Sequence, residues 1–523
     1  MTSPNDHPPL SQRSVLLRFV RWLFRWSTVR RVLLTLACLA TLIALFNAEE
    51  NWRGKRAWEK FRREWEAKGE QFDLAAFIPK PVPDEQNFAK TPFFAPLLDY
   101  EFKGKQRETV WKDTNAVERT RAVNVYGPAS ETKAPTFGGL ERGDLTDLRQ
   151  WQEFYRGNTN FPSPPQPGDP ARDVLFALRK FDPVLNELHE ANRRPHTVFP
   201  VHYDENYAAL LPYLGCLKSL STVLRLRATA SLAAGQNEDA LRDIKLGFRI
   251  AESVKTEPLL ISQLVRIAVL HVGMNSIWES LAAPRWSEPQ LRELQQLLAG
   301  TELLADYERA MRGERAFGND LMDKLRRRTY FTRDRLTQDI GLQSISQLVS
   351  LAPTGWLYQN QLCINRLHQE RTLPLIDAAQ HRAYPEKCAG LDDLPELRKT
   401  TPYNVFARML FPAVTKAAAK TARSQATIDL ATVACALERF RLANGQYPEQ
   451  LAALVPRFIE KLPLDLINGE PLKYRRTEDG RFLLYSVGWN QTDDGGTIAL
   501  TRSKRPSQQD EQGDWVWRYP AKE

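Results

Sequence analysis

The chain has 523 residues, of which 42% are hydrophobic and 26% are charged. This length and mix predict a globular protein with more than one domain and exclude a wholly disordered chain. The formal net charge is +9, but residues 1–31 alone contain six arginines and a single aspartate. The basic character is therefore concentrated at the N-terminus rather than along a surface for phosphates, so we expect no nucleic-acid partner.

An apolar segment follows these arginines. Residues 32–46 carry no charge, and nine of the fifteen are Val, Leu, Ile or Phe. Each of these nine side chains contributes roughly −0.3 to −0.6 kcal/mol at the centre of a bilayer. We therefore predict an uncleaved transmembrane signal anchor at residues 32–48. The alternative, a cleaved signal peptide, needs a small residue where Phe46 stands.

The arginines also predict an orientation. All six precede the apolar segment, and positive charge stays on the cytoplasmic side of a membrane. We expect a single-pass protein of the inner (cytoplasmic) membrane, with a cytoplasmic N-terminus and the bulk of the chain in the periplasm.

Aromatic residues recur with helical spacing after the anchor. Trp58, Phe61, Trp65 and Phe72 fall on one face of a helix that we expect within residues 49–72. Such a face either lies on the membrane or a partner, or packs on the protein's own body. The spacing does not distinguish these alternatives.

The middle of the chain changes character near residue 170. Residues 73–170 are rich in proline and predict irregular structure, with a short strand near Val123–Tyr126. Residues 171–400 have helical periodicity. A helical hairpin around Gly235, with Asn237 as the expected N-cap of its second helix, resembles a tetratricopeptide unit. No second copy follows at a period of about 34 residues, so we do not predict a repeat array.

Two further helical patterns follow in this region. Ser287 and Gln290 form the sequence of a capping box ahead of a leucine stripe that begins at Leu291. Beyond it, carboxylates alternate with arginines and predict a solvated, ion-paired helix face. These carboxylates are Glu302, Asp306, Glu308 and Glu314.

No catalytic motif of a known class is present, so we expect no catalytic residue and no enzyme. The alternative hypothesis is an enzyme with an active site around His196, His202 and Asp204, where titratable groups are concentrated. His189 and Glu205 complete this group. The five cysteines include no CxxC pair, which argues against a zinc site. Cys363 and Cys388 either pair in an oxidising compartment or remain buried thiols.

The pattern is most regular near the C-terminus. A helix from about Thr415 has Ile428, Val433 and Leu437 on its inward face and ends at Gly445, where glycine tolerates a left-handed cap. A short helix from Pro448, a turn and a two-stranded hairpin follow. The motif residues of this region are Phe440, Arg441, Asn444, Gly445, Tyr447, Pro448, Pro463, Asp465, Gly469, Pro471, Tyr474, Leu484, Tyr485, Ser486 and Gly488.

In order and type these residues resemble the C-terminal domain of the type II secretion major pseudopilins, over residues 422–501. The resemblance implies a long helix with a small antiparallel sheet and a link to secretion or pilus machinery. The anchor lacks the leader motif of pseudopilins and lies far from the helix, which argues against a filament subunit. The whole chain also resembles an uncharacterised bacterial membrane-anchored family that brings no known activity.

The same resemblance implies a calcium loop after the last strand. Asn490, Asp493 and Asp494 are the candidate ligands, because calcium prefers side-chain oxygens of this kind. Two carboxylates are few for an ion that takes six to eight oxygens. The alternative is a polar β-turn with solvated aspartates.

The sequence thus predicts a mostly α protein: a single N-terminal transmembrane helix, a helical middle domain with a tetratricopeptide-like hairpin, and a C-terminal α+β pseudopilin-like module. We expect a non-enzymatic interaction or scaffold protein, held in the membrane by residues 32–48 and bound to an unidentified envelope protein. Calcium is its only candidate cofactor. The expected parts are a basic cytoplasmic segment (1–31), the anchor (32–48), a juxtamembrane amphipathic helix (49–72), an irregular region (73–170), a helical domain (171–400), the module (401–505) and a polar tail (506–523).

Overall fold

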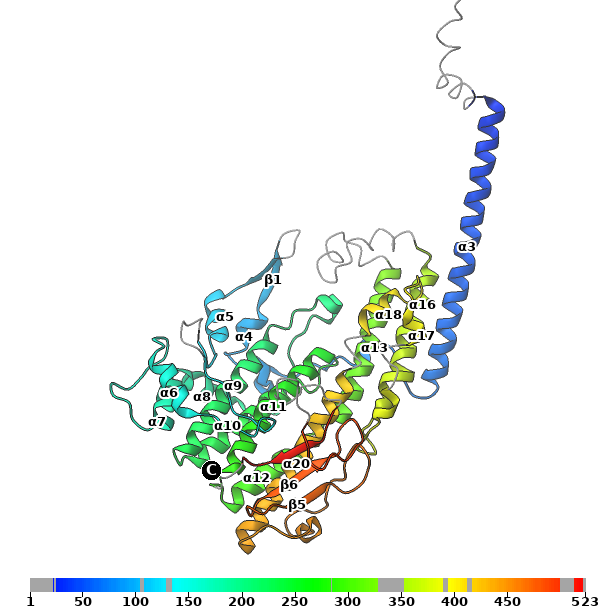
Figure 1. Ribbon diagram of the computed structural model, residues 1–523. Coiled ribbons are helices and arrows are strands. Elements are labelled where there is room, and N and C mark those ends of the chain that lie inside the picture. The colour runs from blue at the N-terminus through cyan, green and yellow to red at the C-terminus, as the bar shows by residue number, and fades with distance from the viewer. Residues whose placement is uncertain are drawn as a thin grey trace, which may run out of the picture.

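The computed structural model describes Trp22 and residues 25–103, 108–127, 134–283, 285–327, 352–388, 394–411, 416–498 and 512–520. The chain is mostly helical, with 60% helix and 8% strand, and the described strands form three small antiparallel sheets. Figure 1 shows one long N-terminal helix standing at the edge of a helical body. The predicted mostly α class is confirmed.

The N-terminal helix α3 runs from Trp26 to Glu66 without interruption, so the predicted anchor and juxtamembrane helix are one element. Its 41 residues span roughly 60 Å at about 1.5 Å per residue, twice the thickness of a hydrocarbon core of about 30 Å. The apolar part of α3 is long enough to cross a membrane and none of it is buried in the protein. It is compatible with a single-pass membrane anchor.

The second half of α3 packs on helix α16 (Thr354–Leu367), and their backbones touch (Figure 1). A Cβ added at Gly355 would lie 2.0 Å from the carbonyl oxygen of Glu50, and one added at Gly54 would lie 2.4 Å from the carbonyl oxygen of Gly355. Asn51 Oδ1 accepts hydrogen bonds from the Gly355 N–H (2.7 Å) and the Thr354 hydroxyl (3.0 Å). A side chain of α3 therefore caps the first turn of α16.

The aromatic face of α3 adds to this contact. Trp58, Phe61 and Phe72 form a buried cluster with Leu362 of α16. Packing on the protein's own body is thus the observed alternative for the aromatic residues of 49–72. Beyond the helix, the buried Arg315 donates to Glu70 Oε2 at 2.7 Å and ties this segment to helix α13 (Leu304–Arg326).

Residues 73–170, the predicted irregular region, contain more regular structure than their high proline content suggests. The strand expected near Val123–Tyr126 is wrong: Val123 and Val125 are buried loop residues, and the strands lie at β1 and β2 instead. The elements of this region are η1 (Leu74–Ala76), η2 (Asp84–Gln86), η3 (Phe88–Lys90), α4 (Ala95–Leu98), β1 (Tyr100–Lys103), β2 (Glu108–Trp111), α5 (Thr114–Arg121) and α6 (Leu148–Arg156). The predicted helical region then begins with α7 (Pro170–Leu178), η4 (Arg179–Phe181), α8 (Asp182–Ala191) and η5 (Tyr203–Ala208). Asp113, Asp147 and Asp169 cap α5, α6 and α7, which is why these helices begin where they do.

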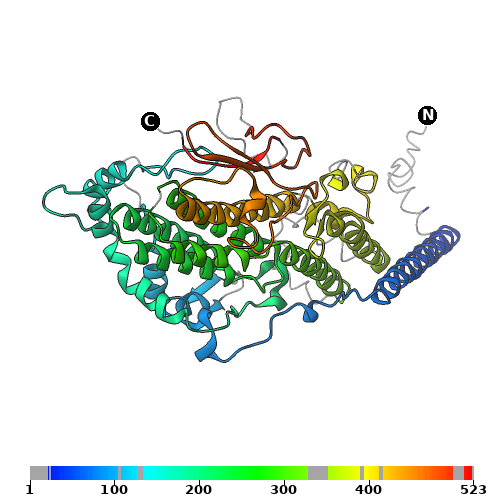
Figure 2. The same cartoon turned by 90° about the horizontal axis from the view of Figure 1, so that it is seen from below.

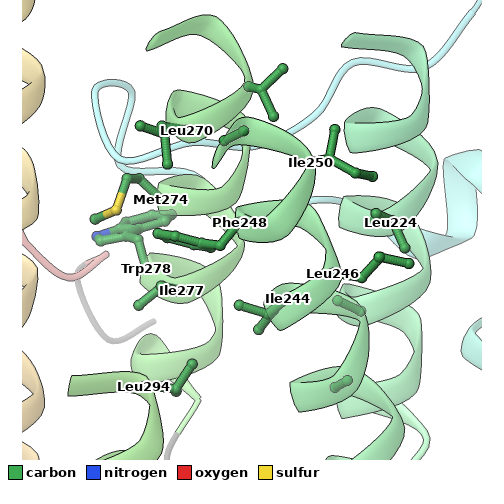
Figure 3. Packing of buried hydrophobic residues seen from close by; sticks show 14 of the residues in the cluster. Leu224, Ile244, Leu246, Phe248, Ile250, Leu270, Met274, Ile277, Trp278 and Leu294 are labelled. Carbon is green, nitrogen blue, oxygen red and sulfur yellow. The ribbon is translucent and has the colours of Figure 1, made fainter. Parts of the chain in front are cut away.

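Four helices form the centre of the body: α9 (Tyr213–Ala233), α10 (Asn237–Glu252), α11 (Leu260–Ala282) and α12 (Glu288–Ala299). Figure 3 shows Phe248 of α10 packed against Met274 and Trp278 of α11. The capping box of Ser287 and Gln290 is confirmed at the start of α12. The N-cap expectation is wrong by one residue, because Gln236 precedes α10.

Helix α20 (Ala417–Asn444) joins this centre to the rest of the body. Its C-terminal half, with Ile428, Val433 and Leu437, belongs to the first core cluster, which also contains α9–α12. Its N-terminal half, from Ala417 to Ala426, belongs to a second core cluster with α13 and α16. The helix ends at Gly445 with φ = +81°, so the predicted left-handed cap is confirmed.

A three-stranded sheet lies over α20 (Figure 2). Strands β5 (Lys473–Arg476), β6 (Phe482–Ser486) and β7 (Trp515–Arg518) are antiparallel in the order β5-β6-β7, and Leu484 of β6 is opposite both Tyr474 and Trp517. The remaining elements are η6 (His368–Thr372), η7 (Leu373–Leu375), β3 (Ile376–Asp377), β4 (Arg382–Ala383), η8 (Pro385–Cys388), α17 (Pro395–Arg398), α18 (Val405–Leu410) and η10 (Leu451–Leu454).

The predicted polar tail is wrong for residues 515–518. They form β7, because three of the four side chains are apolar and Trp517 is fully buried in the first core cluster. Trp278 of α11 also donates its indole N–H to the Arg518 carbonyl at 2.8 Å. The expected module at 401–505 therefore lacks one strand of its own sheet, and its core is shared with the middle of the chain.

The burial of Trp517 leads to a first prediction. Trp517→Ala should lower the free energy of unfolding by about 3–5 kcal/mol, since it leaves a cavity in the first core cluster between the sheet and the helices. Arg518→Ala in the same strand is the control, because this side chain is exposed and its loss should change stability by less than about 0.5 kcal/mol. Denaturant unfolding of the two variants provides the comparison, and equal losses would contradict a shared core.

The contact between α3 and α16 leads to a second prediction. Gly355→Ala should destabilise the protein by about 1–3 kcal/mol, because the new methyl group meets the Glu50 carbonyl. Limited proteolysis should then cut faster after Lys68, in the turn that follows α3. Gly215→Ala is the matched control: this glycine is also helical and has nothing within 4 Å of an added Cβ. Similar cleavage of both variants would show that α3 is not held by this contact.

Candidate functional site

The histidine-rich group predicted as an alternative active site does not form one site. His189 Nε2 lies 3.1 Å from Asp243 Oδ1, and Asp243 also pairs with Arg227 at 3.0 Å, so this histidine belongs to a buried ion-pair network between α8 and α10. The ring of His202 packs edge-on against Tyr100, with centroids 5.9 Å apart.

Burial is the main reason why the pKa of Tyr100 is raised, and the charges of Glu205 and Asp204 add to it, so both carboxylates lie near the tyrosine that His202 packs against. Glu205 is buried, while the backbone carbonyl of Asp204 accepts from Lys324. His196 lines a cavity of about 730 Å³, and none of the other four residues is among those described around it. His196 therefore stands apart from His202 and Asp204, and an active site at these residues stays a prediction.

The candidate calcium loop uses its side-chain oxygens for contacts within the protein. Asp493 Oδ1 accepts from the Tyr485 hydroxyl (3.0 Å) and the Gly495 N–H (3.1 Å), and Asp493 Oδ2 lies 3.4 Å from the Lys473 ammonium. The hydrogen bond from Gly495 is the main reason why the pKa of Asp493 is lowered. Asn490 donates its amide to Asp494 Oδ2 at 2.9 Å.

A third carboxylate stands beside this loop and was missed by the sequence analysis. Asp514 accepts hydrogen bonds from the Gly496 N–H (2.7 Å) and the Asp494 N–H (3.3 Å). Within the described ranges, no group of three or more His, Cys, Asp or Glu side chains could hold a metal ion. Calcium binding at Asn490, Asp493 and Asp494 stays a prediction.

The predicted solvated carboxylate face on α13 is wrong for two of its members. Asp306 is buried and pairs with the fully buried Arg266 of α11. Glu314 accepts from the Leu260 N–H at 2.8 Å, and burial raises its pKa to about 7. Asp306 and Glu314 therefore face inward, where a buried arginine and the start of α11 satisfy them.

The cysteines fit the buried-thiol alternative in part. Cys216 and Cys435 are buried, and burial raises the pKa of Cys216 to about 12. Cys363 and Cys388 are half-buried beside the second core cluster, and their pairing stays a prediction.

A cleft that the sequence analysis did not predict lies between α12, α20, the β3–β4 hairpin and the loop from Pro456 to Leu464. Its volume is about 1030 Å³. His381 stands in it, at the end of the β3–β4 turn, with φ = +52°. A non-glycine residue in this left-handed conformation is strained, and such strain is concentrated at functional sites.

A chain of hydrogen bonds fixes the His381 ring. His381 Nε2 lies 2.9 Å from Asp429 Oδ2 on α20, and Asp429 Oδ1 accepts from Gln425 Nε2 at 3.0 Å. Gln425 in turn accepts from the Leu303 N–H at 2.9 Å. The second ring nitrogen, Nδ1, lies 3.9 Å from Glu302 Oε2.

These carboxylates favour the charged imidazolium. The hydrogen bond to Asp429 is the largest cause of the raised pKa of His381, and the negative charges of Asp429 and Glu302 add to it. The cleft also contains Arg457 and Lys461, which are exposed. The residues described around it include no serine or cysteine nucleophile. The exposed cations suit the binding of an acidic group.

A sequence signal for this site did exist. Gln425 and Asp429 lie one helical turn apart on a face of α20 that is otherwise apolar, and buried polar residues in such a face need partners. The partner His381 could not be found from spacing, because it lies far away in sequence on an irregular hairpin.

Comparison with protein-family models, with curated proteins and with solved structures finds no match to this chain. The pseudopilin and tetratricopeptide resemblances therefore rest on their motif residues alone and stay hypotheses.

The pairing of His381 with Asp429 leads to a third prediction. Asp429→Asn should lower the pKa of His381, because the anion that stabilises the imidazolium is lost while partial burial remains. The pH dependence of diethylpyrocarbonate modification, followed on the His381 peptide by mass spectrometry, reports the neutral ring. Its midpoint should move to lower pH in Asp429→Asn and by less in Glu302→Gln, since Glu302 acts only through space. An unchanged midpoint in Asp429→Asn would contradict the assigned contact.

Proposed function

We propose that the protein is a non-enzymatic, single-pass interaction or scaffold protein of the inner membrane, which holds its body at a fixed orientation beneath the bilayer. The observation that carries this proposal is the continuity of α3. Its exposed apolar half suits a membrane, and its other half is locked against α16.

The spacing along α3 supports a fixed orientation. Glu50 is buried against the body only four residues after the exposed Phe46, a rise of about 6 Å along a helix. The Glu50 carboxylate accepts from the Trp356 indole at 3.0 Å. No flexible linker separates the apolar half of α3 from the body, so a membrane that holds the first also orients the second.

The arginine asymmetry supports a cytoplasmic N-terminus and a periplasmic body. The motif residues of the C-terminal region support a partner in secretion or pilus machinery, contacted by α20 and its sheet. The α9–α10 hairpin, which resembles a tetratricopeptide unit, is a second candidate contact surface. The cleft at His381 would offer such a partner a place for an acidic side chain.

An enzyme remains the second candidate, and one observation favours it: the strained His381, whose ring is oriented by Asp429. A histidine held by a carboxylate is a common arrangement for proton transfer. A His381→Ala variant that keeps its fold and its crosslinked partners but loses function in the cell would favour the enzyme over the scaffold.

The orientation leads to a fourth prediction. A reporter that is active only in the periplasm should be active when it is fused after Glu523. A reporter that is active only in the cytoplasm should be inactive at the same position. Replacing Arg25, Arg30 and Arg31 with glutamate should reduce the first signal, because the charge difference across the span is then lost. The reverse pattern of reporter activity in the wild type would contradict the proposed topology.

A further inference from the structure

Helix α11 has an apolar face that the body covers only in part. Like α3, it is long and apolar enough to cross a membrane, but 56% of its apolar window is buried in the body. Leu270, Met274 and Trp278 account for much of this burial. Leu264, Ile267 and Ala268, by contrast, are only half-buried.

These half-buried residues line a cavity of about 590 Å³ between α11 and α20. Trp515 and Val516 of β7 form another part of its wall, and Ile428 contributes from α20. Pockets that hold small molecules are mostly apolar, have volumes of roughly 300–1,000 Å³ and are frequent between helices of bundles. The size and walls of this cavity fit that class.

His271 of α11 also lines this cavity. Burial lowers its pKa below the usual value for histidine, while the charge of Glu141 favours the cation and the charges of Arg423 and Arg225 oppose it.

Two lysines stand at this cavity without a counter-charge. Lys218 and Lys420 line it and are exposed, and over the described residues neither side chain has an ion pair or hydrogen bond. The other cation, Arg423, is paired with Glu141 at 2.7 Å. The remaining acid, Asp514, accepts two backbone N–H groups of the neighbouring loop. Among the described residues around the cavity, the unmatched charge is therefore positive.

We propose that the cavity between α11 and α20 binds a single-chain amphiphile with an apolar body and a carboxylate head group, the head lying toward Lys218 and Lys420. The apolar walls would hold the chain, and the lysines would pair with the carboxylate. A site for such a ligand is independent of the proposed scaffold function, although a body held close to a membrane has a ready source of fatty acids.

A fluorescent fatty acid, 11-(dansylamino)undecanoic acid, tests the proposal on the full chain in nanodiscs, with empty nanodiscs subtracted. The matching dansyl alcohol lacks the charge and is the ligand control. We expect saturable binding of the acid to the wild type. Ala268→Phe should bind both probes at least tenfold more weakly. The double variant Lys218→Gln/Lys420→Gln should bind the acid alone about fivefold more weakly. Lys461→Gln, at the other cleft, is the control variant and should bind like wild type.

Three outcomes would overturn the proposal. Absence of saturable binding would mean that the cavity is not open to a ligand. Equal affinity for acid and alcohol would exclude recognition of the carboxylate. Unchanged binding by Ala268→Phe, checked by melting to be folded, would place the probe elsewhere. If that variant does not fold, the lysine double variant still decides, because its side chains are exposed and their replacement leaves the core intact.

Discussion

The contact of α3 with α16 is the constraint on which the rest of the architecture depends. Two glycines let the backbones touch, and Asn51 satisfies the start of α16 from the neighbouring helix. If either helix shifted along the other, the Gly355 N–H and the Thr354 hydroxyl would lose their acceptor, and the glycines would no longer face each other. The membrane-compatible helix is thus a structural part of the body, and the surfaces of the body have one fixed orientation relative to α3.

Buried arginines extend this rigidity through the body. Arg266 joins α11 to α13, and Arg315 joins α13 to the segment that follows α3. Removing one partner of such a pair leaves a charge without compensation inside the protein, which is strongly destabilising. These pairs fix which helices lie side by side. They explain why α13, whose charged residues predict a solvated helix face, lies in the middle of the body.

Structure that depends on residues close together in sequence could be predicted, and structure that depends on distant partners mostly could not. Local signals gave correct results: the capping box at Ser287, the left-handed cap at Gly445 and the apolar stripe of α20 depend on neighbours within a few residues. Apart from the N-cap of α10 and the strand expected near Val123–Tyr126, the errors concern long-range partners. Asp306 and Glu314 are buried because Arg266 and the start of α11 provide their partners, which lie far away in sequence. Residues 515–518 form a strand because they pair with β6 and because Trp278 donates to the Arg518 carbonyl. The His381–Asp429 pair belongs to the same class, because no local pattern joins a turn to a distant helix.

The position of β7 has a consequence for the order of synthesis. The middle of the chain supplies α9 to α12 early, but the strand that completes their core is made from residues 515–518. Domains made early in synthesis generally fold first. Here the nascent body must wait, with the edge of β6 unpaired and Trp278 lacking its acceptor, until the last strand has emerged. An open edge is a template for aggregation. The growing chain therefore has a vulnerable interval in which a chaperone, or the neighbouring membrane, would have to shield it.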